Sequence, residues 1–411
     1  MRPTRNFPFL LGAFFISTVG DWLYRLALPL LVLRMTGSAL STATVYALEY
    51  APYLVFSLVG GLAADRLDRR RLLVSSDLCS AGIVGVLVVL VLAGEQQVWM
   101  IYLVAFALAA VRPFYHPAFQ SVVPELVPDE RLERANARLQ TVESALNFAG
   151  PVLGGVIIAT LGTTQALVAN AISFLLSAAA ISFIRLPVDT RIVERGARIW
   201  AQVRAGVSYL REDRVMFWGS TLMAGTNIGL YLIEGNLIFY LVRYRHFPIS
   251  WVGVVFGAQG VGAVIGAVLA PWLGRRLHAG VLIVLSMLGA GAATALLIPA
   301  RSAAAIAIAW GAVGVFTMVI VVTWFTLRQR TVPRALLGRV VAISRMMSFA
   351  AIPVASVAGG ALLGATGDAT ALIALSAAVQ VTIGVAAWFT ALRDAGRVAG
   401  VRAGPAAEAE A

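Results

Sequence analysis

Eight ionisable side chains lie inside apolar stretches of this chain, where inserting a charge into a membrane costs about 2.5 to 3.5 kcal/mol. An acid held there can bind and release a proton. Burial favours the neutral carboxyl and a neighbouring cation favours the ionised one, so an acid beside an arginine can alternate between the two partners. The eight are Asp21, Arg25, Glu49, Asp77, Arg112, Glu143, Glu234 and Arg345.

Their depths suggest pairs. At a rise of about 1.5 Å per residue, Asp21 and Arg112 are expected roughly 18 and 15 Å from the membrane edge nearest the N-terminus. Arg25 and Glu49 fall roughly 24 and 22 Å from that edge. Arg25 would then bridge Asp21, one helical turn away, and Glu49 on the next helix. The alternative is a static ion pair that only orients helices.

Glu234 has no basic partner expected at its depth, so it is a second candidate proton carrier. It could also contact a cationic compound, or be a solvated residue near a loop. Four further groups are expected roughly 7 to 10 Å from the edge, in a charge cluster with Asp65 and Arg69. They are Asp77, His116, Glu143 and Arg345.

Aromatic and amide side chains on these stretches could line a substrate cavity, because such cavities combine apolar walls with a few polar anchors. The candidates are Trp22, Tyr24, Phe114, Tyr115, Asn227 and Tyr231. The alternative is ordinary packing or an interfacial position.

The elements that carry these residues are predicted to be membrane-spanning helices. The 411 residues are 60% hydrophobic and 13% charged, with a mean hydropathy of +0.85, which excludes a soluble fold and leaves no room for a sizeable enzyme domain. Twelve apolar windows of spanning length are expected, six and six. They cover residues 9–33, 43–64, 72–93, 98–121, 138–160, 164–186, 215–241, 250–273, 279–298, 303–327, 338–363 and 369–392.

Charge predicts the orientation. The net charge is +12 and all basic residues are arginines, gathered in short connections. Lipid headgroups are therefore the expected anionic partner, and no nucleic acid is expected. If the N-terminus is cytoplasmic, only four arginines fall in connections outside the membrane: Arg34, Arg243, Arg245 and Arg301. This asymmetry predicts that both termini are cytoplasmic. The first apolar stretch is expected to be retained as a span.

Motifs for cofactors are not apparent. Cys79 is the single cysteine and has no His or Cys cluster beside it, which argues against a thiolate metal site. A phosphate-binding loop needs a lysine, and the chain has none. We expect no cofactor and no metal, and energy from an ion gradient.

The two halves repeat each other. Residues 63–70 match residues 269–276, and Pro151 with Gly154 and Gly155 recurs as Pro353 with Gly359 and Gly360. Parallel six-helix halves with a site between them are one transporter architecture. The expected organisation is a first bundle over 1–186, a linker with an interfacial helix over 187–214, a second bundle over 215–393 and a disordered cytoplasmic tail over 394–411.

Two segments resemble the major facilitator superfamily. Residues 61–70, Gly-Leu-Ala-Ala-Asp-Arg-Leu-Asp-Arg-Arg, look like its loop signature, and residues 150–155, Gly-Pro-Val-Leu-Gly-Gly, look like its antiporter motif. With Gly20-Asp21-Trp22 and residues 131–136, the pattern is most similar to the drug:proton antiporter branch that includes macrolide-efflux and enterobactin-exporter proteins. Asp68 and Leu146 stand where glycine is usual.

The resemblance implies roles for both motifs. Asp65 would meet the N-terminus of the eleventh span and lock an outward-facing state, a favourable place for a carboxylate. The gating residues would be Gly61, Asp65, Arg66, Arg69 and Arg70. The antiporter residues would be Gly150, Pro151, Gly154 and Gly155, whose alternative is small-residue packing. Spans one and four would line the cavity of the first half.

The resemblance further implies a monomeric, proton-coupled exporter of amphipathic small molecules such as drugs or siderophores, in the bacterial plasma membrane, working by alternating access. It is not expected to be an enzyme. One alternative is a uniporter or proton symporter that imports a metabolite. An intramembrane enzyme or lipid-handling protein is disfavoured, because the adjacent acids outside the spans are flanked by arginine and read as solvated loop charge.

Overall fold

The protein was analysed as a computed structural model that describes residues 6–184 and 199–396. The side chains of residues 57–62, 64–66, 129, 133, 199–203, 334 and 335 are not described. The first half contains α1 (Phe7–Thr36), α2 (Ala39–Arg66), α3 (Arg69–Ala93), α4 (Val98–Leu126), α5 (Asp129–Leu161) and α6 (Thr163–Ser182). After α7 (Ile199–Glu212), the second half contains α8 (Arg214–Glu234), α9 (Leu237–Phe239), α10 (Ile249–Gly274), α11 (Ala279–Ala295), α12 (Ala303–Thr331), α13 (Arg334–Thr366) and α14 (Ala369–Trp388).

Long apolar helices dominate the fold. Within the described residues, nine helices are long and apolar enough to cross a membrane: α1, α3, α4, α5, α6, α10, α12, α13 and α14. The helices α2, α8 and α11 occupy the positions of the other three predicted spans, and α11 is 17 residues long. The predicted count of twelve therefore depends on these three.

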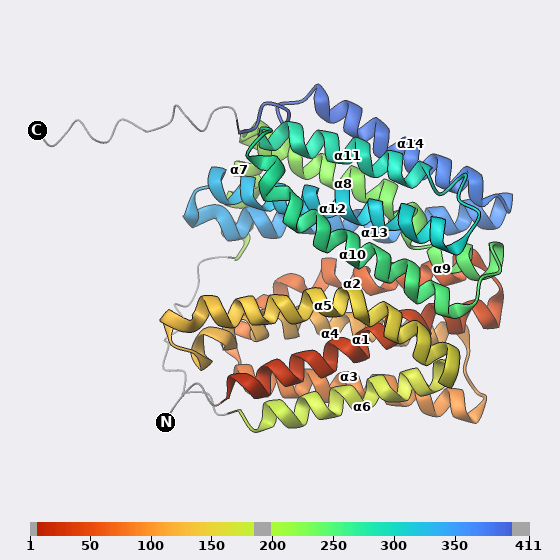
Figure 1. Ribbon diagram of the computed structural model, residues 1–411. Coiled ribbons are helices and arrows are strands. Elements are labelled where there is room, and N and C mark those ends of the chain that lie inside the picture. Colours follow the sequence, from red (N-terminus) through yellow and green to blue (C-terminus); the bar gives the residue numbers. More distant parts are fainter. Residues whose placement is uncertain (1–5, 185–198, 397–411) are drawn as a thin grey trace, which may run out of the picture.

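The helices form two bundles. In Figure 1, α1–α6 lie in the lower half of the view and α8–α14 in the upper half. In the first bundle, α1 packs on α5 and α6, while α4 packs on α2 and α3. In the second, α12 packs on α10 and α11, while α8 packs on α13 and α14. Two helix pairs join the bundles, α2 with α13 and α5 with α10. The fold is the predicted all-α membrane architecture of two related halves.

Short polar side chains and glycines cap the ends of neighbouring helices. Ser38 and Asp68 accept hydrogen bonds from the first turns of α2 and α3, and Gly37 and Gly94 close α1 and α3 in the left-handed conformation. These caps satisfy backbone groups that a helix end leaves unpaired. Asp68 thus has a structural task at the position where the family signature usually has glycine.

The seventh predicted span is broken, which the sequence analysis did not anticipate. Instead of one helix through residue 241, α8 ends at Glu234, and α9 continues into a π-helical segment, Tyr240–Tyr244. Asn236 donates from Nδ2 to the carbonyls of Leu232 (2.9 Å) and Ser356 (3.1 Å). An asparagine side chain that bonds to backbone competes with the helical ladder, and here it also ties the break to α13.

The described part of the linker helix packs on protein, and its expected interfacial position stays a prediction. α7 packs against α13 and α8, and its Leu210 is 4% exposed, in a cluster with Met216, Val332 and Ile343. Protein rather than lipid therefore buries the described part of its apolar face. The preceding predicted linker residues, 187–198, and the tail from 397 onward lie outside the described residues.

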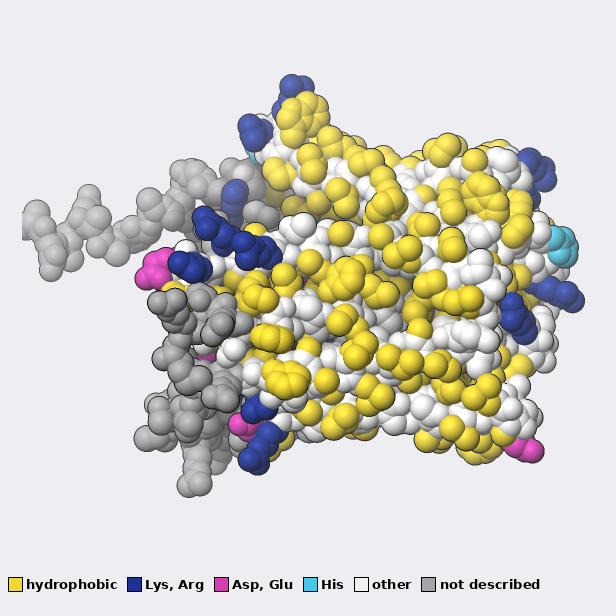
Figure 2. Space-filling view, turned by 60° about the horizontal axis from the view of Figure 1, so that its bottom comes forward, with side chains coloured by type: hydrophobic (Ala, Val, Ile, Leu, Met, Phe, Trp, Pro, Cys, Tyr) yellow, Lys and Arg dark blue, Asp and Glu magenta, His cyan; other side chains and the backbone are white. Residues whose placement is uncertain are grey.

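Figure 2 shows hydrophobic side chains over the broad middle of one face and arginines gathered at its two ends. Several large apolar side chains are exposed on the helices, among them Ile308 (74%), Val268 (71%) and Val89 (65%). Such an apolar surface is suited to lipid and unsuited to water. We call the end of the molecule that carries α7 the linker end and the opposite end the distal end (Figure 1).

Candidate functional site

A charged cavity lies inside the first half. Arg112 of α4 and Asp21 of α1 form an ion pair, with 3.6 Å between the guanidinium Nη2 and the carboxylate Oδ2. Their side chains are 23% and 31% exposed, and both line a cavity of about 150 Å³. The similar depths that the sequence predicts for Asp21 and Arg112 thus correspond to an ion pair in the structure. Molecules of the size of water can reach this pair.

Two more acids and a histidine line the same cavity: Asp77, Glu143 and His116. Asp77 is 2% exposed and accepts a hydrogen bond of 2.6 Å from Ser177 of α6. The sequence analysis had assigned these groups to a separate cluster with Asp65 and Arg69. That assignment is wrong for the three, because depth along a helix does not say which face a residue occupies.

Arg25 does not form the expected bridge in this conformation. Its guanidinium lies over the Trp22 ring, 5.3 Å from the centroid, and its Nε is buried without a hydrogen-bond partner. The ion pairs between described side chains do not include Arg25 with Asp21 or with Glu49. Arg25 nevertheless lines the cavity beside Asp21, one helical turn further along α1.

A second polar cluster lies where the halves meet. Glu234, at the end of α8, is 9% exposed. Its carboxylate accepts long hydrogen bonds from Tyr46 of α2 (3.5 Å) and from Gln259 of α10 (3.4 Å). Glu234 therefore has hydroxyl and amide partners from both halves, and no ion pair joins it to a cation among the described side chains.

Aromatic rings extend this cluster toward the linker end. Tyr50 lies 5.7 Å from Tyr231 and 5.8 Å from Phe349 of α13, centroid to centroid. Tyr53 lies 5.3 Å from Phe349, and Arg345 stacks on both rings, 5.6 Å from Tyr53 and 5.1 Å from Phe349. The sequence analysis missed this column, although tyrosines at 46, 50 and 53 follow the spacing of one helix face.

The remaining predicted cavity residues have mixed outcomes. Trp22 and Tyr115 line the cavity. Tyr24 does not, since it is 1% exposed within the apolar core on another face of α1. Asn227 donates to the Ser348 carbonyl at 3.0 Å, and Phe114 packs near Phe56, 6.5 Å between centroids.

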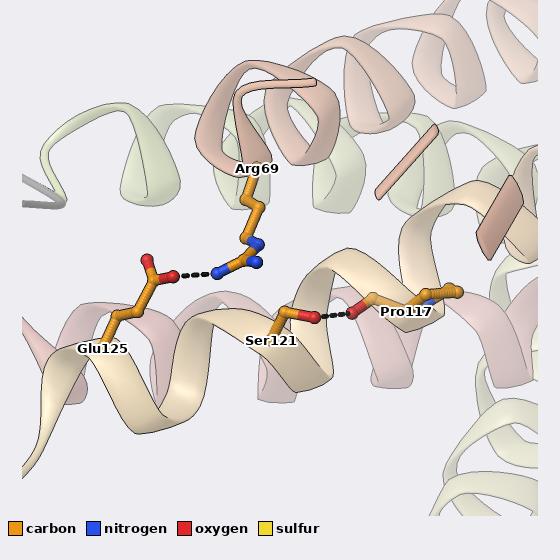
Figure 3. A network of polar contacts seen from close by, with 4 residues as sticks. All are labelled: Arg69, Pro117, Ser121 and Glu125. Atoms are coloured by element: carbon orange, nitrogen blue, oxygen red, sulfur yellow. Dashed lines mark hydrogen bonds and ion pairs between the residues drawn. The ribbon is translucent and has the colours of Figure 1, made fainter. Parts of the chain in front are cut away.

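The loop signature is held by contacts at the linker end. Arg69, at the start of α3, pairs with Glu125 near the end of α4, as Figure 3 shows, while Arg70 donates to the carbonyl of Ser182. Ser121, one turn before Glu125, donates to the Pro117 carbonyl at 2.8 Å. The surroundings of Gly61 and the side chains of Asp65 and Arg66 lie outside the described part of the structure. The lock assigned to Asp65 therefore stays a prediction.

The antiporter motif lies at two close helix contacts. A Cβ on Gly150 would stand 2.3 Å from the Trp22 ring, so this glycine lets α5 accept the aromatic wall of the cavity. A Cβ on Gly253 of α10 would stand 2.4 Å from the Pro151 carbonyl oxygen, and one on Gly155 would stand 2.9 Å from the Gly253 Cα. The motif thus couples the cavity of the first half to the contact between the halves.

Comparisons with known proteins agree with this architecture. The model of the Major Facilitator Superfamily matches residues 10–356. Macrolide efflux protein A of Streptococcus pyogenes is 23% identical over 266 residues, which are 63% of this chain and 64% of that protein. Multidrug efflux pump Tap of Mycolicibacterium fortuitum is 28% identical over 412 residues, which cover 96% of this chain and 98% of Tap.

Solved structures with the same fold are more distant in sequence. A bacterial homologue of the iron transporter ferroportin, in an inward-facing state, has a TM-score of 0.71 at 19% identity and covers 93% of this chain and 98% of its own. The nucleoside transporter NupG has a TM-score of 0.74 at 12% identity, covering 92% and 98%. With two helical halves, the family match over most of its length and relatives named as efflux pumps, the chain belongs to the major facilitator superfamily of membrane transporters.

Proposed function

We propose that the protein is a proton-coupled exporter of amphipathic small molecules in the bacterial plasma membrane. The observation that carries the proposal is the Asp21–Arg112 pair in an accessible cavity. A carboxylate there can take a proton when Arg112 moves away and release it when Arg112 returns. The export direction is drawn from the relatives named as efflux pumps.

The helix contacts support alternating access between two bundles. At the distal end, α5 and α10 meet at Gly155 and Gly253, and a Cβ on Gly360 of α13 would stand 2.9 Å from the Leu40 Cα of α2. Toward the linker end, α5 and α10 separate around an open groove. We assign the linker end to the cytoplasm from the arginine distribution, so this conformation would admit cargo from inside.

Glu234 supplies a second step in the proposed cycle. Its partners Tyr46 and Gln259 belong to different halves, so rocking of the halves would break at least one hydrogen bond. A buried carboxylate that loses a donor favours its protonated form. Glu234 would therefore register the movement of the halves, while Asp21 would respond to the occupancy of the cavity.

The rest of the proposal concerns organisation. We assign a first bundle over 1–186, a linker over 187–214, a second bundle over 215–393 and a cytoplasmic tail over 394–411. The transporter would work as a monomer, because each half supplies one side of the central site. Its partners would be the transported molecule, protons and membrane lipids.

Transport in everted membrane vesicles tests the proposal. With the vesicle interior acidified, wild-type protein is expected to accumulate a labelled macrolide or a cationic dye, and collapse of the proton gradient should release it. Asp21→Asn should reduce this accumulation at least tenfold, because the amide cannot carry a proton.

The matched control is Glu130→Gln, which removes an exposed carboxylate at the linker end of α5. It should transport like wild type. Failure of the wild-type protein to accumulate any probe under the gradient would contradict export. Gradient-driven accumulation by Asp21→Asn at the wild-type level would instead transfer the proton to another acid.

A further inference from the structure

The helices α5 and α10, one from each half, contact each other near the distal end and diverge toward the linker end. They touch at Gly155 and Gly253, and a further glycine contact toward the linker end is at Asn147, where a Cβ on Gly260 would stand 2.4 Å from the Asn147 carbonyl oxygen. Beyond that point an open groove of about 660 Å³ separates them. Figure 1 shows α5 and α10 spreading apart in this direction.

The walls of this groove are almost entirely apolar at their deep end. They include Ala145 and Phe148 of α5 and Val261, Val264 and Ile265 of α10. Phe148, Val264 and Ile265 are 44%, 44% and 46% exposed there. Water gains few hydrogen bonds in such a slot, whereas a hydrocarbon chain would cover the apolar surface.

Arginines mark the shallow end of the same groove. Arg134 and Arg138 precede the lining residue Thr141 by seven and three positions, so they continue its face of α5. Two residues after the end of α10 at Gly274, Arg276 stacks on Trp272, 4.5 Å from the ring centroid. All three arginines are exposed, and among the described side chains of α5 the exposed carboxylates are Glu130 and Glu143.

The length of the groove fits one leaflet. Phe148 and Arg138 are ten residues apart, which is about 15 Å along a helix. Half of a hydrocarbon core of about 30 Å is also about 15 Å. A chain that begins at the arginines would therefore end at the contact between Asn147 and Gly260.

We propose that this groove binds one anionic phospholipid from the leaflet at the linker end. Its acyl chain occupies the slot between Phe148 and Val264, and its phosphate is bound by Arg134 and Arg138 of α5. An occupant in a wedge that narrows toward the distal end holds the two halves apart at the linker end. The lipid is therefore a ligand of this conformation, separate from the transported molecule.

Native mass spectrometry of the full-length protein tests the site with two probes, phosphatidylglycerol and phosphatidylcholine. Wild-type protein should retain one phosphatidylglycerol in preference to phosphatidylcholine. Arg134→Gln/Arg138→Gln should raise its dissociation constant about thirtyfold, from roughly 1 kcal/mol per arginine near a lipid surface. The matched control Arg71→Gln/Arg211→Gln removes two exposed arginines from the linker end elsewhere and should bind like wild type.

A second variant tests the slot independently of charge. Ala145→Trp fills the groove while leaving every arginine in place, and it should lose the retained lipid. Equal loss of affinity in the two double variants, or equal retention of both lipids by wild type, would overturn the headgroup site. Undiminished binding to Ala145→Trp would overturn the slot. None of these outcomes depends on transport, so they are distinct from failure of the exporter proposal.

Discussion

The cavity of the first half and the cluster between the halves solve the problem of a membrane-embedded acid differently. Asp21 is about one-third exposed and has a cation, Arg112, as its partner from the same half. Glu234 is 9% exposed, and among the described side chains its hydrogen-bond partners are neutral groups, one from each half. In the proposed cycle, the first arrangement would keep its charge partner when the halves move, whereas the second would lose the Tyr46 hydrogen bond.

Under the proposed function, this difference would separate two tasks. A pair within one half would respond to protons and cargo without rearranging the bundle. An acid whose partners lie on opposite halves would respond to the conformation itself. Four substitutions test whether the two regions are as distinct as their contacts indicate.

The largest effect is expected at the charge pair. Arg112→Gln should reduce gradient-driven accumulation at least tenfold, because Asp21 loses the cation that competes with its proton. The same change should lower the free energy of unfolding by about 1 to 2 kcal/mol, less than for a fully buried pair because both side chains are partly solvated. Asp21→Asn/Arg112→Gln should recover that stability without recovering transport. Thermal unfolding followed by tryptophan fluorescence would measure the stability of the single and double variants. If the losses of stability from the two substitutions simply add in the double variant, the pairing is contradicted.

The contact between α5 and α10 is the next largest. Gly253→Ala should destabilise the distal contact by about 1 to 3 kcal/mol, because the added methyl meets the Pro151 backbone and forces the helices apart. Spectroscopic distances between labels at the distal ends should lengthen. Gly274→Ala on the same helix, where a Cβ meets nothing within 4 Å, should leave both distance and stability unchanged.

Glu234→Gln should slow transport several-fold while changing the free energy of unfolding by less than about 1 kcal/mol. The amide keeps one oxygen, which can accept from Tyr46 or from Gln259, so the titrating charge and one long hydrogen bond are lost. Comparison of its pH profile with wild type is the decisive measurement. An unchanged profile would assign all proton dependence to the first half.

The smallest effect is expected for Tyr46→Phe, which removes one long hydrogen bond to Glu234 and retains the aromatic stacking with Tyr50. A twofold to threefold reduction in turnover is expected, with no change in stability beyond about 0.5 kcal/mol. Gln259→Ala should have a similar effect. If either variant loses transport as completely as Arg112→Gln, the two regions act as one site.

Hydropathy and charge were sufficient to locate the long helices, because a spanning helix must be apolar over a fixed length. They also placed Asp21 opposite Arg112, since both residues lie at similar depths on helices of one half. Tyr24 was assigned to the cavity wrongly because it lies on a different face of α1 from Asp21. Tyr46 shares one helix face with Tyr50 and Tyr53, but that spacing does not say which helix of the other half it meets. Gln259 was missed for the same reason, since the register between helices of different halves leaves no signal in the sequence.

The break after Glu234 was missed for another reason. The apolar window continues through residue 241, and nothing in its hydropathy marks the side chain of Asn236 as a competitor for backbone bonds. Such competition is visible only when the acceptor on α13 is known. The contacts of Asp65 remain a prediction of the family signature.

That interruption of the seventh span has a mechanical consequence. A continuous helix acts as a stiff rod that carries a tilt from one membrane surface to the other, but two shorter rods meeting at Gly235 can pivot separately. In the proposed cycle, the portion at the linker end would tilt while the portion beyond the joint stays bonded to Ser356. The linker end would then open without separating the helices at the distal end.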